Sequence, residues 1–321
     1  MLEFYKTFED GTRKITEPEP GCWINAVAPT EEERNYLIEQ IGILPEFVKS
    51  SLDEEESSHI DYDDDFRQAL IIFDYPSAEN EDDDSIDSTY STLPVGIVIL
   101  KGYVVTISLY ENRSILEMSQ GRIKGMDTRL KTRFFLLLAL RISQRFLICL
   151  RQIDRLSSRT ETRLHQSVEN DELIEMLGLE KSLVYFSTSL KSDEVTLSKI
   201  MRGKQIQLYE EDEDLLEDVM IEIHQAIEMC NIYSNTMAGT MDTFASIISN
   251  NMNIVMNKLT VITIVMAIPN IIFGFYGMNV QLPFPFVWFP SFVAILACVV
   301  ATVYFFRHNI CLLYTSPSPR D

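Results

Sequence analysis

A stripe of amide, hydroxyl and small side chains follows one face of an expected helix near the end of the chain. Its members are separated by 4, 3, 3, 4, 3, 4 and 3 positions, a spacing that keeps them on one side of an α-helix. Neutral oxygen atoms can accept hydrogen bonds from the waters around a hydrated metal ion, and glycines leave backbone carbonyls uncovered. The pattern therefore predicts a surface that contacts hydrated cations. Its members are Asn253, Asn257, Thr260, Thr263, Ala267, Asn270, Gly274 and Gly277.

Most of this stripe lies in a long uncharged segment. No Asp, Glu, Lys, Arg or His occurs in the 48 residues from Leu259 to Phe306, although 23% of the chain is charged. A turn marked by glycine and proline divides the segment into two apolar arms, each long enough at about 1.5 Å per residue to cross a hydrocarbon layer of about 30 Å. We therefore expect two transmembrane helices, 259–278 and 288–306, joined by an extracytoplasmic loop at 279–287. The alternative is a buried helical hairpin in a soluble protein.

The two arms differ in polarity. The second is apolar all round, as suits a helix that faces lipid, whereas the first carries the polar stripe. Polar groups at membrane depth are costly unless they meet a partner or line a wet cavity. A single helix cannot enclose water, so we expect several copies of the chain to turn this face toward a central pore. The alternative is a seam of small residues that packs helices together without conduction.

Tyr276-Gly277-Met278-Asn279, at the outer end of the first expected span, resembles the signature of CorA-type magnesium channels. The resemblance extends over nearly the whole chain, from the acidic N-terminal half through a long helix to the two-span terminus. It implies an α+β cytosolic domain with a mixed β-sheet and helices, then a long stalk helix and two C-terminal transmembrane helices, in a homopentamer. It also implies uptake of Mg²⁺ down its electrochemical gradient, with Co²⁺ and Ni²⁺ as secondary ions. The spacing itself does not distinguish five subunits from four.

The resemblance also assigns roles to individual positions. Gly277, Met278 and Asn279 would form the selectivity filter, and Met256 and Leu259 match a hydrophobic constriction that closes by dewetting. Alternatively, Asn279 is a turn residue that caps the helix end, and the two apolar residues only pack helices. Many relatives carry threonine at the position of Asn270, which directly follows Pro269 in this chain. The remaining expected pore-lining residues are Asn253, Thr260, Thr263, Asn270 and Gly274.

Regulation by cytosolic Mg²⁺ is a further implication of the resemblance. In the family, Mg²⁺ bridges a stalk aspartate and an acidic group on the neighbouring subunit, and this favours the closed state. Asp218 matches the stalk position, whereas the partner position falls on Ser50, with Asp53 and Glu54 nearby. Loss of Mg²⁺ would leave like charges facing each other and loosen the ring. Mg²⁺ would thus be both transported and regulatory, with Asp218, Asp53 and Glu54 as regulatory ligands; alternatively, Asp218 is an exposed helix carboxylate.

The chain is expected to divide into cytosolic and membrane parts. We expect an α/β domain at 1–127, a helical hairpin at 128–207 and a stalk helix at 208–258. After the second span, a short cytosolic tail would occupy 307–310. The last residues, 311–321, resemble the translation of a sequencing adapter, so we expect the native chain to differ from about residue 310 onward.

Local patterns give more detail within the first domain. Cys22 to Val27 is a candidate strand, and Thr30 with Glu33 predicts a capping box that opens a helix running to about Ile41. Three β-rich runs follow, two of them joined through a Lys-Gly turn. These runs are 68–75, 93–100 and 103–109.

Composition limits the possible partners. The net charge of −21 argues against nucleic acid and suits a protein that handles cations. The five cysteines are scattered, which fits a reducing cytosol. The four histidines are isolated and no nucleophile motif or phosphate-binding loop occurs, so no enzyme chemistry is expected. The expected partners are further copies of the chain, the lipid bilayer and divalent cations.

Charges next to the spans indicate orientation. Lys258 and Arg307 flank the two expected spans, whereas the loop between the spans carries no charge. Together with the resemblance, this distribution predicts that both termini lie in the cytosol, in the inner membrane of a prokaryote. Two alternatives to a magnesium channel remain open: a ZntB-like zinc transporter on the same scaffold, and a non-conducting membrane-anchored sensor.

Overall fold

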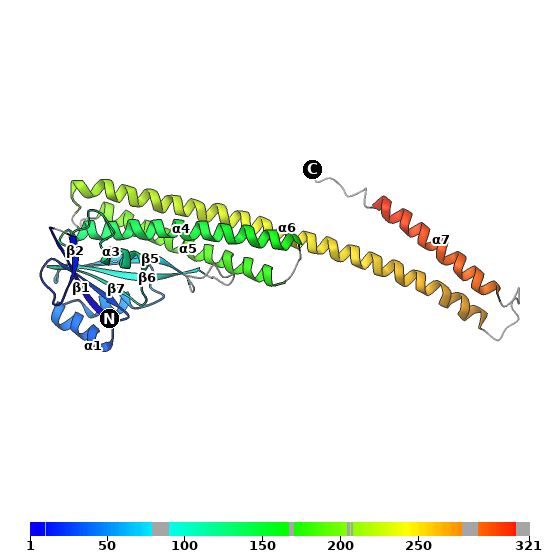
Figure 1. The fold of residues 1–321 in the computed structure, drawn as a ribbon, viewed down its shortest axis with the longest axis horizontal. Coiled ribbons are helices and arrows are strands. Elements are labelled where there is room, and N and C mark those ends of the chain that lie inside the picture. The colour runs from blue at the N-terminus through cyan, green and yellow to red at the C-terminus, as the bar shows by residue number, and fades with distance from the viewer. Residues whose placement is uncertain are drawn as a thin grey trace. The chain divides into compact units, whose positions relative to one another are not determined.

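The computed structural model of the 321-residue chain describes residues 1–9, 11–78, 90–166, 170–203, 206, 208–277 and 288–312. The chain separates into two compact units, Met1–Met241 and Asp242–Asp321. Figure 1 shows the elements in chain order.

The first unit is built on a seven-stranded sheet with the order β2-β1-β3-β7-β6-β5-β4. Neighbouring strands pair antiparallel except for β3 and β7, which are parallel. The sheet is therefore mixed, as the sequence predicted. The strands are β1 (Leu2–Phe8), β2 (Gly11–Ile15), β3 (Cys22–Val27), β4 (His59–Asp63), β5 (Gln68–Ala78), β6 (Tyr90–Leu100) and β7 (Tyr103–Ser108).

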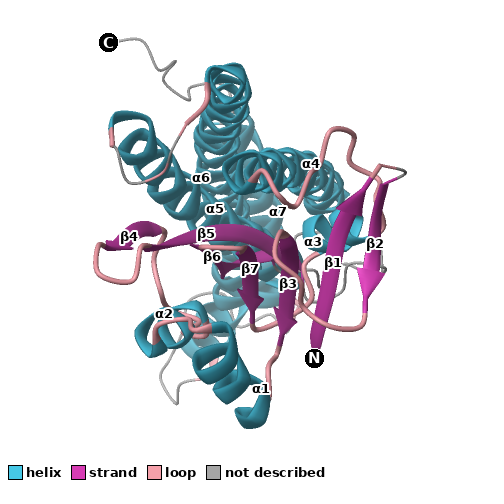
Figure 2. Cartoon of the chain, turned by 90° about the vertical axis from the view of Figure 1, so that its left-hand side faces the viewer, coloured by secondary structure: helices cyan, strands magenta, loops and turns pink. Residues whose placement is uncertain are grey.

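Helices cover both faces of this sheet, as Figure 2 shows. Strand side chains alternate between the two faces, so adjacent residues enter different cores. Trp23 lies in the core that includes α4 (Lys131–Gln166) and α5 (Asn170–Arg202), where its ring stacks on Tyr5 with centroids 4.9 Å apart. Ile24, the next residue, lies in the opposite core.

Two short helical segments cover that opposite face. The predicted capping box opens α1 (Glu31–Tyr36): the Glu33 amide donates to the Thr30 hydroxyl, and the Thr30 amide donates to the Glu33 carboxylate. A π-helical segment, η1 (Leu37–Ile41), continues it, so the predicted helix exists but changes its winding after Tyr36. The next helix, α2 (Pro45–Ser51), packs so closely on β6 that a Cβ at Gly96 would lie 1.9 Å from Ser51 Oγ.

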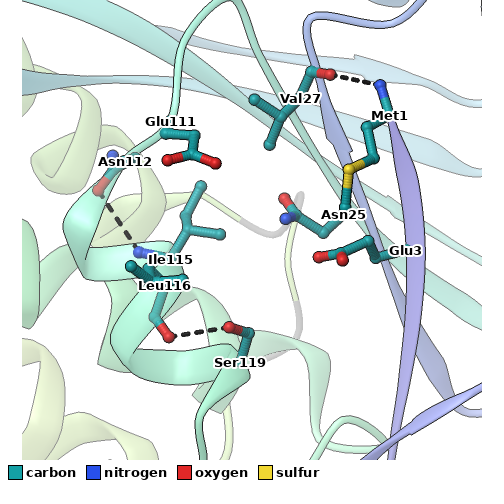
Figure 3. A pocket seen from close by; sticks show the side chains of 9 residues that line it. All are labelled: Met1, Glu3, Asn25, Val27, Glu111, Asn112, Ile115, Leu116 and Ser119. Carbon is teal, nitrogen blue, oxygen red and sulfur yellow. Dashed lines mark hydrogen bonds between the residues drawn. The ribbon is translucent and has the colours of Figure 1, made fainter.

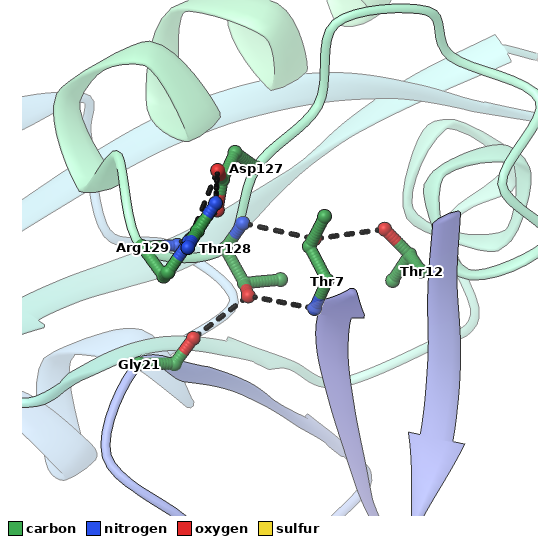
Figure 4. A network of polar contacts seen from close by, with 6 residues as sticks. All are labelled: Thr7, Thr12, Gly21, Asp127, Thr128 and Arg129. Carbon is green, nitrogen blue, oxygen red and sulfur yellow. Dashed lines mark hydrogen bonds and ion pairs between the residues drawn. The ribbon is translucent and has the colours of Figure 1, made fainter. Parts of the chain in front are cut away.

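Hydrogen bonds also join the end of β1 to the segment before α4 (Figure 4). The Thr7 amide donates to Thr128 Oγ1, and the Thr128 amide donates to Thr7 Oγ1, both at 3.1 Å. Thr128 Oγ1 donates in turn to the Gly21 carbonyl at 2.7 Å. The start of the long helix α4 is thereby fixed to the antiparallel edge of the sheet.

The helices that follow agree with the expected pattern. α4 and α5 are two successive helices in the segment 128–207, where a helical hairpin was expected. α6 (Glu210–Tyr276) is one helix of 67 residues that crosses the boundary between the two units. α7 (Phe289–Leu312) extends beyond Phe306, the predicted end of the second span. The remaining helix is α3 (Arg113–Ser119), which Asn112 caps.

Membrane-spanning character is clearest for α6. Among the described residues, one helical segment, Glu210–Phe275, is long and apolar enough to cross a membrane, and 0% of its most apolar window is buried. This exposure disfavours the alternative of a buried hairpin in a soluble core. The helical segment Phe289–Tyr304 is apolar but shorter, so the second span stays a prediction.

Candidate ion pathway

The polar stripe lies on the exposed surface of α6. All of its expected pore-lining members are exposed within the second unit, where neither α6 nor α7 covers them. Met256 and Leu259, the expected constriction, are 54% and 55% exposed. The chain by itself therefore leaves these side chains open to an occupant or to another copy. The exposed residues with an expected role in the pathway are Asn253, Met256, Leu259, Thr260, Thr263, Asn270, Gly274 and Gly277.

α7 packs on the other side of α6 from the stripe. At about 100° per residue, the half-buried positions of α6 lie about half a helical turn away from the stripe residues of the same segment. On this side Cys298 Sγ lies 3.7 Å from the Val265 carbonyl oxygen. The apolar partner helix and the polar surface thus occupy opposite faces of α6. The half-buried positions are Val261, Val265, Ile268, Pro269 and Ile272.

The stripe residues on the far side of α6 from this packed face are Thr260, Thr263, Asn270 and Gly274. Because α7 covers neither their oxygen atoms nor the glycine backbone, this face is available to line a shared, water-filled space. Figure 1 shows α7 running in the opposite direction to the last part of α6.

Two threonines on the stripe are oriented as hydrogen-bond acceptors. Thr260 Oγ1 donates to the Met256 carbonyl and Thr263 Oγ1 donates to the Leu259 carbonyl, both at 2.8 Å. Each hydroxyl proton is therefore used within the helix, and the oxygen lone pairs remain for an outside donor. The waters of a hydrated cation point their hydrogens outward, so such oxygens suit an ion that keeps its water shell.

The expected selectivity filter is described only at its first residue. Gly277 follows α6, and its amide donates to the Phe273 carbonyl at 2.9 Å. A Cβ at this position would lie 3.1 Å from that carbonyl oxygen, so a side chain would require a local shift. Met278 and Asn279 lie outside the described residues. The filter as a whole therefore stays a prediction.

The expected regulatory ligands are exposed in the first unit. Asp218 lies on α6, whereas Asp53 and Glu54 follow α2, and the Asp53 carboxylate accepts a hydrogen bond from the Glu55 amide at 3.1 Å. Among the residues that the structure describes, no three His, Cys, Asp or Glu side chains are grouped so that they could hold a metal ion. One chain alone thus does not assemble this site.

Sequence reasoning did not identify a small pocket between the sheet and α3. Its volume is about 90 Å³, and the side chains of Glu3, Asn25 and Glu111 point into it (Figure 3). Burial raises the pKa of Glu3, but hydrogen bonds from Lys14 and Tyr5 outweigh it and leave the pKa below its usual value. No motif in the sequence marks this pocket, because its walls come from distant segments.

A domain of this fold, continued by an exposed apolar helix with a polar stripe and a second apolar helix, is consistent with a membrane transport protein. Residues 19–308 match the family described as CorA-like Mg²⁺ transporter protein, and the chain belongs to this family. Membership agrees with the prediction of a transport protein and not an enzyme. The resemblance inferred from the sequence is thereby confirmed.

One sequence relative supports the same assignment, and two solved structures share the fold. The chain is 29% identical over 266 residues to the cobalt/magnesium transport protein CorA of Methanocaldococcus jannaschii, an alignment that covers 80% of this chain and 79% of the relative. The complete structure of the CorA magnesium transporter from that organism has a TM-score of 0.78 at 23% identity, covering 99% of this chain and 98% of the other. The ZntB cytoplasmic domain from Vibrio parahaemolyticus has a TM-score of 0.58 at 12% identity, covering 78% of this chain and 97% of the domain.

Proposed function

We propose that the chain is one subunit of a homo-oligomeric channel that takes up Mg²⁺ down its electrochemical gradient, with Co²⁺ and Ni²⁺ as secondary ions. The observation that carries the proposal is the arrangement of α6, whose exposed polar stripe lies opposite the face that packs against α7. Several copies of α6 around an axis would enclose water and turn the acceptor oxygens inward. The number five comes from the family resemblance.

The ion would travel with its water shell. Mg²⁺ loses water reluctantly, so neutral acceptors that contact its waters allow faster passage than tight carboxylate ligands. Thr260 and Thr263 supply such acceptors, and Asn253, Asn270 and the backbone near Gly274 would add further rings. Gly277, Met278 and Asn279 would form the filter at the outer end.

Closure would occur at Met256 and Leu259. Their side chains are largely exposed in the single subunit, so copies of them could meet at the axis and exclude water. Cytosolic Mg²⁺ bound between Asp218 of one subunit and the Asp53–Glu54 region of another would favour this closed state, because it removes repulsion between carboxylates. Depletion of Mg²⁺ would restore the repulsion and favour opening.

The membrane arrangement completes the proposal. Both α6 and α7 would cross the inner membrane of a prokaryote, with both termini in the cytosol. The membrane potential supplies about 2.3 kcal/mol per elementary charge per 100 mV, and about twice as much for a divalent ion. Uptake would therefore need no ATP.

Flux measurements on the full chain in liposomes test the proposal. With an internal Mg²⁺ indicator and a potential negative inside, we expect Mg²⁺ influx that Asn279→Ala strongly reduces. Larger flux of Zn²⁺ than of Mg²⁺ would favour the ZntB-like alternative, whereas absence of any flux would favour the non-conducting sensor. The mass of the complex in lipid is the second measurement, and a strictly monomeric chain contradicts a shared pore.

A further inference from the structure

The outer edge of β5 is completed by a helix where its neighbouring strand ends. β4 pairs with β5 only as far as His59 and Ile72, so beyond Ile72 no described strand pairs with β5 on that side. α5 fills this position: the Asp74 amide donates to Asp193 Oδ1 at 3.0 Å. Nearby, Ser58 Oγ donates to the Ile72 carbonyl at 2.9 Å. A side chain of α5 thus continues the hydrogen bonding of the sheet.

The side chains of Asp74 and Asp193, which meet at this contact, are both buried. Asp74 is 7% exposed and Asp193 is 0% exposed. Asp193 Oδ2 has no hydrogen-bond partner within the described part of the chain, and no ion pair between either carboxyl and a basic side chain occurs there. Two buried acidic groups without a counter-ion cannot both be charged at low cost.

The groups that face the pair are hydroxyls. Ser189 on α5 hydrogen-bonds Asp74, and its Oγ lies 2.8 Å from Thr92 Oγ1 of β6. Ser58, which precedes β4, hydrogen-bonds Asp193, and its Oγ lies 2.9 Å from Thr196 Oγ1 of α5. The charged groups that act on the pair are thus the two carboxyls themselves. Hydroxyls stabilise an anion less than a cation would, so they do not remove the need for a proton.

The electrostatics follow from this environment. Burial raises the pKa of Asp74 from 3.8 to about 6, against the opposing effect of the hydrogen bond with Ser189. Burial, together with the negative charge of Asp74, raises the pKa of Asp193 well above its usual value. Because two buried carboxyls cannot both be charged at low cost, we expect the pair to hold one proton near neutral pH.

We propose that Asp74 and Asp193 form a proton-binding switch that joins α5 to the sheet. With one proton bound, the pair carries a single charge and α5 stays on the edge of β5. When this last proton leaves to water at alkaline pH, two anions face each other in the interior, and repulsion weakens the contact between α5 and the sheet. The switch lies in the first unit and does not depend on the proposed transport.

Infrared spectroscopy of the full chain in nanodiscs tests the proton directly. At neutral pH we expect a C=O band of a protonated carboxylic acid that is lost in Asp193→Asn. Titration of the parent chain to alkaline pH should remove the same band as the proton leaves. Asp65→Asn, at an exposed position in the turn after β4, is the control and should leave the band unchanged. A parent chain without the band at neutral pH overturns the proposal.

The decisive measurement is the pH at which half of the Asp193 band is lost, compared between the parent chain and Asp74→Asn. Because the charge of Asp74 holds the proton on Asp193, Asp74→Asn should shift the titration of the Asp193 band to lower pH than in the parent chain. An unchanged midpoint overturns the proposal. Hydrogen exchange gives a second readout: at about pH 9, amides of α5 should exchange faster in the parent than in Asp193→Asn, and equal rates would also overturn it.

Discussion

The Cys298 thiol donates a hydrogen bond, at 3.7 Å, to the Val265 carbonyl oxygen across the contact between α7 and α6. Pro269 lies four residues after Val265 and has no N–H, so the helix itself cannot supply the usual donor to this carbonyl. In a hydrocarbon layer an unsatisfied carbonyl is costly. The thiol therefore serves two purposes, because it satisfies the carbonyl and holds α7 against α6.

Replacement of this thiol should separate hydrogen bonding from packing. Cys298→Val keeps a small apolar side chain but removes the donor, and should lower the free energy of unfolding by about 0.6–2 kcal/mol. Cys298→Ser keeps a donor and should cost less than the valine variant. Unfolding of the full chain in mixed micelles with increasing SDS measures both values. Equal stability of the valine variant and the parent would show that the hydrogen bond contributes nothing.

Threonine oxygens on the stripe should control Mg²⁺ flux. Thr263→Val removes an outward-facing acceptor at nearly constant volume, so we expect a several-fold loss of flux in liposomes, whereas Thr263→Ser should retain most of it. Thr302→Val on α7 is the matched control, because Thr302 Oγ1 also donates to a carbonyl of its own helix, that of Cys298, at 2.7 Å. If both valine variants reduce flux equally, the effect does not come from the stripe.

The charge of Asp218 should control inhibition by cytosolic Mg²⁺. Asp218→Lys places a fixed positive charge where the proposal puts the bridging ion, so the channel should stay closed when Mg²⁺ is removed from the cytosolic side. Flux is measured at low and high Mg²⁺ on that side. Glu228→Lys makes the same change of charge at another exposed position of α6 and should keep normal feedback. Unchanged feedback in Asp218→Lys would count against a sensor at this position.

Gly96 should tolerate no side chain while Ser51 is present. A Cβ at Gly96 would lie 1.9 Å from Ser51 Oγ and 2.4 Å from Ser51 Cβ, so Gly96→Ala must move α2 away from β6. We expect a loss of about 1–3 kcal/mol in the free energy of unfolding, as for other overpacked cores. Ser51→Gly in the same chain removes both clashing atoms and should restore part of the stability. A destabilisation that the second change leaves untouched would point to backbone strain instead.

Local patterns predicted the interior of the sheet better than its edges. The strand Cys22–Val27 was predicted with its observed bounds, because its apolar side chains enter both cores. β1 and β2 were not predicted, since they are partly exposed and carry charged residues between the apolar ones. β4 was not predicted either, because its sequence is rich in acidic residues. It lies at the edge of the sheet, where those residues stay in contact with water.

The candidate sites show the same limit. The spacing of the stripe from Thr260 to Gly277 predicted one helical face, but only the structure shows that α7 packs opposite it. Asp74 and Asp193 are 119 positions apart, and neither belongs to a motif. Their contact depends on where β4 ends and how α5 crosses the sheet, which no local pattern records.

Stability of the first unit should depend on pH through Asp74. In the folded chain its pKa is about 6, against 3.8 for the ordinary group, so the folded state holds this proton more tightly than the unfolded state. The resulting stabilisation is fully present below about pH 3.8, and it is lost as pH rises through about 6, by on the order of 2–3 kcal/mol. Glu3 and Asp127 have lowered pKa values in the folded chain, so their contribution to stability has the opposite pH dependence. It is present at neutral pH and is lost as pH falls through these lowered pKa values.

The contribution of Asp74 to the pH dependence of stability is measured by comparing the parent chain with Asp74→Asn over the same pH range. Asp74→Asn cannot titrate, so the difference in unfolding free energy between this variant and the parent should grow in favour of the variant as pH rises from about 4 to about 7. Chemical unfolding followed by the fluorescence of Trp23, which lies in the core of this unit, provides the measurement. A difference that stays constant over this range would mean that Asp74 titrates alike in the folded and unfolded chains.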